Sequence, residues 1–316
     1  MKLHQLQALV VVADTGSIRA AARLSGLSQT AVSKALRELE RDQKLPLLAR
    51  NANGVAFTSA GQKLLAHARL VISQLERADE ELAEIRGEHV GRLTIAVTPW
   101  VMQAFIPLVL QRFRSQMPDI QLELFEGLSA VALPRLRDGA IDFAIVPQIS
   151  AMPEQEFESE RLVSFNSYVV ARHDHPATHA RSISELLNMD WAMNFTVSTY
   201  PAQMHDLFWQ HGFDVEPRRL HSAHSATLLL ELINQANMIG PCPEPLLLGV
   251  TGEVPVKLDI AEKLQGRTVS IIRRKNAVQG AAARCFVDCI RDVIRQRSRS
   301  SRPEDLRLFD MLEVLL

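Results

Sequence analysis

A cationic, hydroxyl-rich stripe between residues 28 and 41 is the segment whose side chains are best suited to chemistry. On a helix, Val32, Leu36 and Leu39 recur at the spacing of one apolar face. The polar side begins with Ser28 and Gln29 and carries Thr30, Ser33, Lys34, Arg37 and Arg41. Basic side chains neutralise phosphates or bond guanine, and hydroxyl or amide groups bond base edges or the backbone. The stripe therefore indicates binding in a DNA major groove.

The neighbouring residues predict a helix-turn-helix. Ser17 can cap a preceding helix, Gly26 permits the turn, and Ser28 can cap the helix that carries the stripe. Residues 1–60 hold eight Lys and Arg against four Asp and Glu, a net charge of +4. Since the net charge of the whole chain is −1, the net charge of the remaining residues is −5. A basic head on an acidic body is typical of a nucleic-acid module joined to another domain. The alternative is an amphipathic hairpin with a solvated basic face.

This segment resembles the winged helix-turn-helix of the LysR-type transcriptional regulators. The resemblance rests on residues at fixed spacing: Gly16-Ser17, Ala20-Ala21, Leu24, Ser28-Gln29, Ala31, Ser33, Leu36, Leu39-Glu40, Leu47, Arg50, Thr58 and Ala60-Gly61. The chain departs from the family where Thr30 replaces Pro, Gln43-Lys44 replaces Leu-Gly and Leu48 replaces Phe. Because Lys44 replaces the residue best suited to a left-handed helix stop, the end of this helix is weakly specified. The resemblance implies that the stripe binds DNA.

A wing and a long helix are predicted after the stripe. Asn51-Ala52-Asn53-Gly54 forms a hairpin-turn pattern, and the resemblance implies that Arg50, with Asn51 beside it, lies near the DNA backbone. Ser59 and Gln62 have capping-box spacing at the start of a helix that extends to about Arg86. Its apolar seam, at steps of three and four, predicts a partner helix: Leu64, Ala68, Val71, Leu75, Ala78, Leu82 and Ile85. The alternative is packing against its own domain.

The remaining sequence predicts a two-lobed domain. Strands and helices alternate from Arg92 onward, which indicates mainly parallel sheets with helices on both faces. The resemblance implies a periplasmic-binding-protein-like effector domain with crossovers near residues 160–164 and 266–272. The predicted fold is thus a multidomain α+β and α/β chain: a winged helix-turn-helix at 1–58, a linker and dimerisation helix at 59–87, an effector domain at 91–297 (lobe 1 about 91–161 and 268–297, lobe 2 about 162–267), and a tail with a short amphipathic helix at 298–316.

Candidate effector-binding residues follow strands of both lobes. Ligands of such domains bind in the cleft between the lobes, beyond the carboxyl ends of the strands. The candidates are Thr98, Pro99, Trp100, Pro147 and Gln148 in lobe 1, and Phe195, Thr196, Ser198, His221 and Ser222 in lobe 2. Hydroxyl groups and free amides can hold a carboxylate or sulfonate, and an indole can stack on a ring. An organic anion is therefore one candidate effector, although each residue could instead cap a helix or fill the core.

Other kinds of site find little support. Cys285 and Cys289 share a helix face, but no further ligand lies nearby to complete a metal site, and Cys242 stands alone. The sequence has no Gly-rich phosphate loop or convincing nucleophile–base pair. We therefore expect no metal, no cofactor and no catalytic residue. Three cysteines cannot form a closed disulfide framework, and there is no signal peptide or long apolar run, so we expect a soluble cytoplasmic protein without a membrane partner.

These features predict a ligand-responsive transcriptional regulator. It would bind double-stranded promoter DNA as a homodimer or homotetramer, and a small-molecule effector between the lobes would alter the geometry of the oligomer. The competing interpretation is a two-lobed solute-binding or enzymatic protein whose N-terminal helices only mediate assembly. Tight binding to DNA that falls steeply with salt distinguishes the two.

Overall fold

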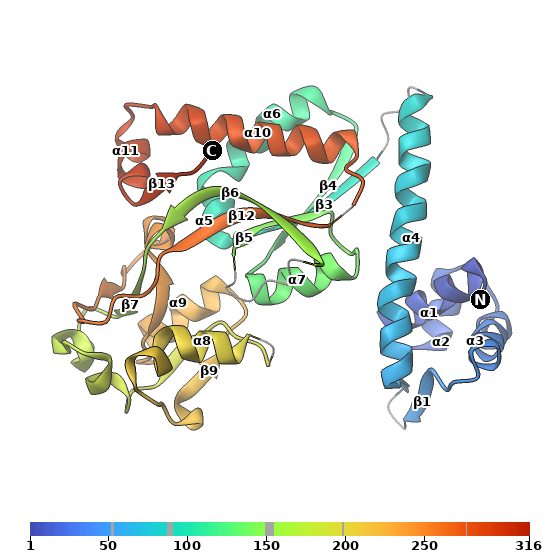
Figure 1. Ribbon diagram of the computed structural model, residues 1–316, viewed down its shortest axis with the longest axis horizontal. Helices are drawn as coiled ribbons and strands as arrows, with labels where there is room; N and C mark the ends of the chain where they lie inside the picture. The colour runs from blue at the N-terminus through green and yellow to red at the C-terminus, as the bar shows by residue number, and fades with distance from the viewer. Residues whose placement is uncertain (52–53, 87–90, 149–154, 198, 276) are drawn as a thin grey trace. The chain divides into compact units, whose positions relative to one another are not determined.

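The computed structural model describes residues 1–51, 54–86, 91–148, 155–197, 199–275 and 277–316. It forms two compact units, one built mainly from residues 1–90 and the other mainly from residues 91–316 (Figure 1). Among the described residues, no helix has both the length and the apolar character needed to cross a membrane.

The first unit is a winged helix-turn-helix with a long helix attached. Its elements are α1 (Leu3–Thr15), α2 (Ile18–Leu24), α3 (Gln29–Gln43), the strands β1 (Leu48–Asn51) and β2 (Gly54–Phe57), and α4 (Ser59–Ile85). Leu9, Val12, Leu36 and Leu39 form the centre of its core and are fully or almost fully buried. The predicted caps are present. Ser17 Oγ accepts from the Ala20 N–H at 3.4 Å, and Ser28 Oγ accepts from the Ala31 N–H at 3.1 Å.

Helix α3 ends at a lysine in the left-handed conformation. Lys44 has φ 54° and ψ 29°, and its N–H bonds the carbonyls of Glu40 and Arg41. The helix therefore stops where a glycine would stop it, although the sequence has no glycine there. A side chain in this conformation costs roughly 1–2 kcal/mol, because Cβ approaches the following carbonyl oxygen.

Replacing Lys44 with glycine is expected to stabilise the first unit by about 1 kcal/mol. Glycine removes the Cβ clash, and its greater freedom in the unfolded chain offsets part of that gain. The measurement is the free energy of unfolding of the first unit, from chemical denaturation of the full chain. Lys44→Ala is the matched control, since it removes the same charge but keeps the Cβ. Equal effects of both substitutions would show that charge, not backbone strain, governs this position.

The wing leads directly into α4. In the hairpin Leu48 faces Phe57 and Asn51 faces Gly54, while the turn residues Ala52 and Asn53 lie outside the described residues. Thr58 begins α4: its Oγ1 accepts from the Gly61 N–H at 3.0 Å and donates to the Pro46 carbonyl at 2.7 Å. The predicted cap at Ser59 is thus wrong by one residue, because the hydroxyl that reaches the free N–H groups belongs to Thr58.

The apolar seam of α4 serves two purposes. At about 1.5 Å per residue, its 27 residues span about 40 Å. Leu64 and Ala68, near its start, pack into the core of the first unit. Further along, Val71, Leu75 and Leu82 are each about half exposed, at 46%, 45% and 52%. Packing against its own domain therefore explains the first part of the seam but leaves the later part exposed in the single chain.

The second unit contains a six-stranded sheet of order β13-β6-β12-β5-β3-β4. Its strands are β3 (Gly91–Val97), β4 (Ile120–Glu126), β5 (Phe143–Pro147), β6 (Phe157–Phe165), β12 (Arg267–Arg274) and β13 (Leu312–Val314). The helices are α5 (Pro99–Ala104), α6 (Ile106–Gln116), α7 (Ser129–Arg137), α10 (Ala281–Ser298) and α11 (Pro303–Phe309). Helices α6 and α10 cover one face, and α7 covers the other (Figure 1). Helices α5 and α6 are separated at Phe105, two residues before Pro107.

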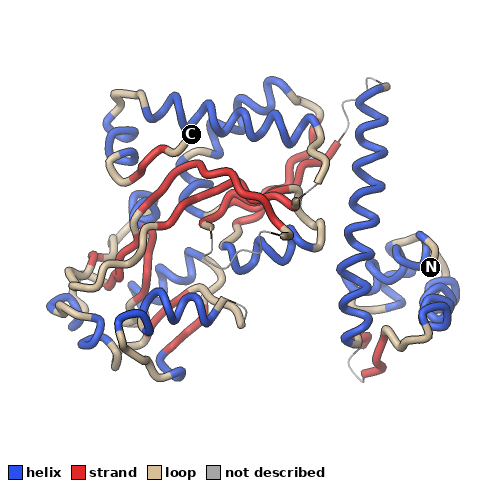
Figure 2. The backbone as a smooth tube through the Cα atoms, viewed as in Figure 1, coloured by secondary structure: helices blue, strands red, loops and turns tan. Residues whose placement is uncertain are grey.

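A smaller lobe occupies residues between β6 and β12. It contains β7 (Ser167–Ala171), β8 (Trp191–Met193), β9 (Leu220–Ser222), β10 (Gly240–Pro243), β11 (Val256–Lys257), α8 (Tyr200–Leu207) and α9 (Ala226–Gln235). Short 3-10 helices fill the intervals at Pro176–His179, Ile183–Leu186, Trp209–His211, Pro217–Arg219 and Glu244–Gly249. Strands β6 and β12 of the six-stranded sheet extend towards this lobe, as Figure 2 shows.

The prediction of mainly parallel sheets is only partly right. Strand β3 pairs in parallel with β4 and β5, and β8 pairs in parallel with β9. Strand β12 is antiparallel to both β5 and β6, and β7 is antiparallel to β10 and β11. The physical reason is the crossover: a strand that brings the chain back from the small lobe enters the large sheet in the opposite direction.

The C-terminal tail is a helix followed by a strand. The sequence predicts a helix alone in this tail, but α11 ends at Phe309 and β13 pairs antiparallel with β6. The edge of β6 has unpaired backbone N–H and C=O groups. Hydrogen bonds to these groups favour a strand for the last residues, although the spacing of the leucines favours a helix. The tail is also fixed by a buried ion pair. Asp305, 3% exposed, accepts from the Arg297 guanidinium.

Acid is expected to weaken the docking of this tail. Burial raises the pKa of Asp305, but hydrogen bonds from Ser300 and Arg297 outweigh it, so the pKa lies below its ordinary value. A lowered carboxylate pKa contributes stability above the unfolded value of about 4, and this contribution is lost as pH falls through the folded value. Asp305→Asn should cost about 1–3 kcal/mol near neutral pH. Thermal denaturation across pH tests this, since the difference between wild type and variant should shrink on acidification. A constant difference would contradict it.

Candidate nucleic-acid interface and effector cavity

Helix α3 presents the polar stripe to solvent. Its buried side is held by Val32, Leu36 and Leu39, which are at most 2% exposed. The opposite residues Ser28, Gln29, Thr30, Lys34 and Arg37 are exposed, and Ser33 is half-buried. Lys34 lies 4.0 Å from Glu38, a loose surface ion pair that leaves its ammonium available. Arg37 forms no ion pair with any residue the structure describes. Hydroxyl, amide and cationic groups thus lie together on one accessible helix face.

A carboxylate positions the wing relative to this helix. Glu40 Oε1 accepts from the backbone N–H groups of Leu47 at 2.8 Å and Leu48 at 3.1 Å. These bonds fix the start of β1, the strand that carries Arg50 and Asn51. The side chains of these two residues lie outside what the structure describes. Glu40 therefore positions the wing. No pattern in the sequence indicates this role.

The second unit contains a cavity of about 140 Å³ lined by residues from both lobes. Helix α5 and the ends of β5 and β6 contribute from the large lobe, and α8, α9 and β10 from the small lobe. Four sequence candidates line it: Thr98, Pro99, Trp100 and Pro147. Further lining residues were not among the candidates, including Ser129, Phe165, Ser167, Gln203, Asp206 and Arg267. Ser129 follows β4 as Thr98 follows β3, so the carboxyl-end rule could have found it.

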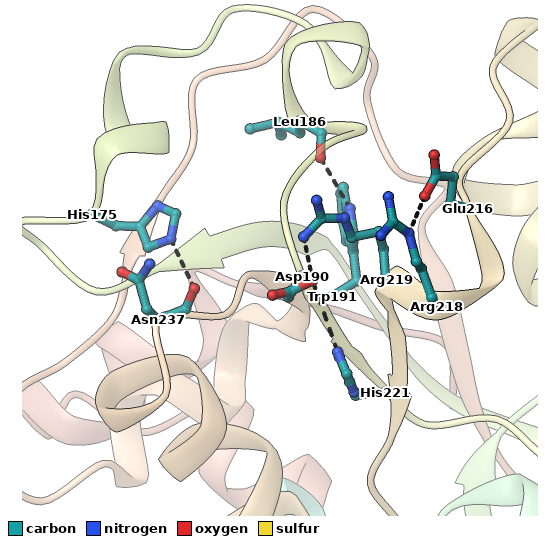
Figure 3. Close-up of polar contacts among 9 residues, drawn as sticks. All are labelled: His175, Leu186, Asp190, Trp191, Glu216, Arg218, Arg219, His221 and Asn237. Carbon is teal, nitrogen blue, oxygen red and sulfur yellow. Dashed lines mark hydrogen bonds and ion pairs between the residues drawn. The ribbon is translucent and has the colours of Figure 1, made fainter.

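The remaining candidates do not line the cavity. Gln148, Phe195, Thr196, His221 and Ser222 are outside its lining, and Ser198 lies outside the described residues. Figure 3 shows His221 directed at Asp190, 3.9 Å away, which also binds Arg219 at 3.0 Å. Ser222 Oγ donates to the Phe195 carbonyl at 2.7 Å. Contacts within the small lobe therefore occupy these side chains.

One buried polar atom of a residue that lines the cavity lacks a partner among the described residues. Trp100 is 2% exposed and packs edge-on against Phe105 and Phe165, with ring centroids 6.3 and 5.3 Å away. Its indole Nε1 is buried and finds no acceptor among the described residues. A buried N–H without a partner costs about 1–3 kcal/mol.

The thiols and the buried histidine are not poised for chemistry. Burial raises the pKa of Cys242 to about 12, and burial together with the neighbouring Cys285 raises that of Cys289 to about 11. Thiols with such values stay protonated and unreactive at neutral pH. His175, 1% exposed, accepts from the Ala177 N–H and donates to the Asn237 carbonyl, as Figure 3 shows in part. Within the described part of the chain, no group of three or more candidate metal ligands gathers.

Family models match both units. The model described as "Bacterial regulatory helix-turn-helix protein, lysR family" matches residues 3–62, and "LysR substrate binding domain" matches residues 86–295. The chain belongs to the LysR family. The first model spans the stripe on α3, and the second spans the cavity.

Known relatives and structures agree with this assignment. The regulator TdcA of Escherichia coli K12 is 24% identical over 293 residues, which cover 92% of this chain and 93% of TdcA. The probable nitrogen assimilation transcriptional activator of Synechococcus elongatus is 31% identical over 185 residues, 58% of this chain and 60% of that protein. Full-length CbnR with its target DNA has a TM-score of 0.59 at 21% identity, covering 93% of this chain and all of CbnR.

The two-lobed architecture is also shared by CbnR alone, a LysR family transcriptional regulator. Its TM-score is 0.61 at 20% identity, over 93% of this chain and 99% of CbnR. At 20% identity, the structural similarity to CbnR establishes the fold alone. Together with the family models, it establishes a LysR-type chain with an N-terminal helix-turn-helix and a two-lobed effector domain. The protein is therefore a ligand-responsive, DNA-binding transcriptional regulator.

Proposed function

We propose that this LysR-family protein recognises its operator with the exposed stripe of α3 and responds to a small molecule in the 140 Å³ cavity. The observation that carries the proposal is the exposed cationic and hydroxyl face of α3, opposite a buried apolar face. The DNA-contacting residues are Ser28, Gln29, Thr30, Ser33, Lys34, Arg37, Arg50 and Asn51. The first six stand on α3 or at its N-cap, and the last two belong to the wing strand β1.

An oligomer follows from the exposed part of the α4 seam. Val71, Leu75 and Leu82 recur at heptad spacing on a helix of about 40 Å. Pairing through α4 gives a homodimer that carries two heads, and further contacts give a homotetramer. Two heads related by a two-fold axis suit an inverted repeat with half-sites about 34 Å apart. The chain acts in the cytoplasm, where its DNA is.

The proposed response needs no catalysis. The effector is held by Thr98, Pro99, Trp100 and Pro147 from the large lobe and by residues of the small lobe. A ligand that binds one arrangement of the lobes more tightly shifts the population towards that arrangement. The shift alters the geometry of the oligomer and hence its affinity for the operator. The raised pKa of Cys242 and that of Cys289 support binding without a thiol-based reaction.

Selection of binding sites from a random double-stranded library tests the DNA-binding part. The full-length protein should enrich an inverted repeat, and its affinity should fall steeply with salt as bound phosphates release counterions. A thermal-shift screen of small organic molecules against the same full-length protein tests the cavity. Thr98→Val should abolish the shift while leaving operator affinity unchanged. Failure to enrich any sequence, with weak salt-insensitive binding, would favour a solute-binding protein whose N-terminal helices only mediate assembly.

A further inference from the structure

The charges at the cavity are internally balanced. Among its described lining residues, Asp206 and Arg267 are the charged ones. They pair with each other, with Arg267 Nη2 at 3.3 Å from Asp206 Oδ2. The cation that could receive a carboxylate or sulfonate is therefore already matched by a carboxylate in the same wall. An anionic ligand would have to displace Asp206 and leave that carboxylate without its partner, or enter without a counter-ion.

Several other polar side chains in the wall already have hydrogen-bond partners. Ser129 Oγ donates to the Pro147 carbonyl at 2.6 Å, and Asn194 Nδ2 donates to the Ala223 carbonyl at 2.8 Å. Thr199 Oγ1 accepts from the Thr196 N–H at 2.9 Å. Trp100 Nε1 stands apart from these, since it is buried without an acceptor among the described residues. The described wall thus offers polar side chains, among them Thr98, Ser167 and Gln203, but no unpaired charge.

The size of the cavity and its apolar surface also limit which ligand it can hold. Most of the remaining wall is apolar, with Phe165, Leu229 and Leu246 among its members. An apolar protein cavity of roughly 150 Å³ is known to hold a benzene molecule. The present cavity, about 140 Å³, is therefore of the size of one six-membered ring with a small substituent.

We infer that the effector is an uncharged molecule with a single ring and a hydrogen-bond acceptor, held against the mostly apolar wall beside the Asp206–Arg267 pair. This inference rests on the proposed function of the cavity and specifies its ligand class. It replaces the organic anion that hydroxyl groups near strand ends had suggested. The Asp206–Arg267 pair acts as the selectivity element, because it closes the cationic site to carboxylates.

A pair of isosteric probes tests the inference on the full-length protein. Benzamide and benzoate share a ring and a carbonyl acceptor but differ in charge. Calorimetry should show benzamide binding about tenfold or more tightly than benzoate. Burying the carboxylate of benzoate costs desolvation free energy, and no unpaired cation in the wall offsets that cost. Trp100→Phe keeps an aromatic ring and removes only a buried N–H, so it should leave the preference for benzamide unchanged.

A second variant separates charge from packing. Asp206→Asn frees Arg267 and should reverse the preference, so that benzoate binds more tightly than benzamide. Asp190→Asn is the matched control: it breaks a comparable ion pair, with Arg219 at 3.0 Å, outside the cavity lining, and should leave the preference unchanged. The reversal is informative even if Trp100→Phe fails to fold.

Four outcomes overturn the inference. Benzoate binding to the wild type at least as tightly as benzamide would show that the ion pair does not exclude anions. An unchanged preference in Asp206→Asn would remove its role in selectivity. If neither probe binds but the broader screen finds a ligand sensitive to Thr98→Val, the single-ring neutral class is wrong and the proposed function stands. If no compound of any class binds, both fail.

Discussion

Arg37→Ala should weaken operator binding by about 1–3 kcal/mol for each head, because an arginine contact to a base or phosphate contributes that much. A dimer carries two copies, so the loss in the complex is expected to approach twice this value. Arg37 is exposed on α3 and forms no ion pair with any described residue, so its removal leaves no buried group unsatisfied. The fold should therefore remain intact, and the loss should report on the interface alone.

The measurement is a gel-shift titration at several salt concentrations. If Arg37 contacts a phosphate, the slope of log affinity against log salt should fall by about one unit for each head. If it contacts a base, affinity should fall mainly for the selected site and little for random DNA. Arg299→Ala is the matched control, since it removes the same charge from an exposed position in the tail. Equal losses in both variants would mean that net charge, not this contact, determines the affinity.

The head was predictable because its signals are local. The caps at Ser17 and Ser28, and the apolar spacing of Val32, Leu36 and Leu39, all depend on residues within one or two turns. Lys44 shows the limit of this reasoning. Its type argues against a left-handed stop, yet the structure places it there, because tertiary packing fixes the path from α3 to the wing.

The cavity was less predictable because its parts are distant in sequence. Thr98 and Pro147 follow strands, and the rule that ligands bind at carboxyl ends of strands selected them. No local pattern marks Asp206 and Arg267, which are 61 residues apart and meet only through the arrangement of the lobes. The tail shows the same effect. The spacing of Leu308, Leu312 and Leu315 is helical, but the unpaired edge of β6 converts the last segment into a strand.

Among the glycines of the first unit whose surroundings the structure describes, Gly61 should be the one where Gly→Ala is most destabilising. A Cβ built on Gly61 would lie 2.0 Å from the Leu47 carbonyl oxygen and 3.0 Å from its carbon. The obstacle is backbone, so no side chain can rotate away. That carbonyl also accepts from the Thr58 N–H at 3.0 Å, which joins the wing to the start of α4.

Accommodating the methyl group requires α4 and the segment at Leu47 to separate. Leu47 is 2% exposed and belongs to the core of the unit, so the displacement extends into that core. We expect a loss of about 3 kcal/mol in the unfolding free energy of the first unit, at the upper end of the usual cost of overpacking. Operator binding should fall with it, because Glu40 holds the wing through the same segment.

Chemical denaturation of the full chain, followed by hydrogen exchange in residues 1–86, measures the effect. Ser59→Ala is the control. Ser59 is exposed and is not the cap of α4, so its loss should change stability by less than about 0.5 kcal/mol. A mild effect of Gly61→Ala would mean that α4 can shift without opening the core, and the close approach at Leu47 would then not determine where the linker helix begins. A large effect of both substitutions would instead identify Ser59 as the cap.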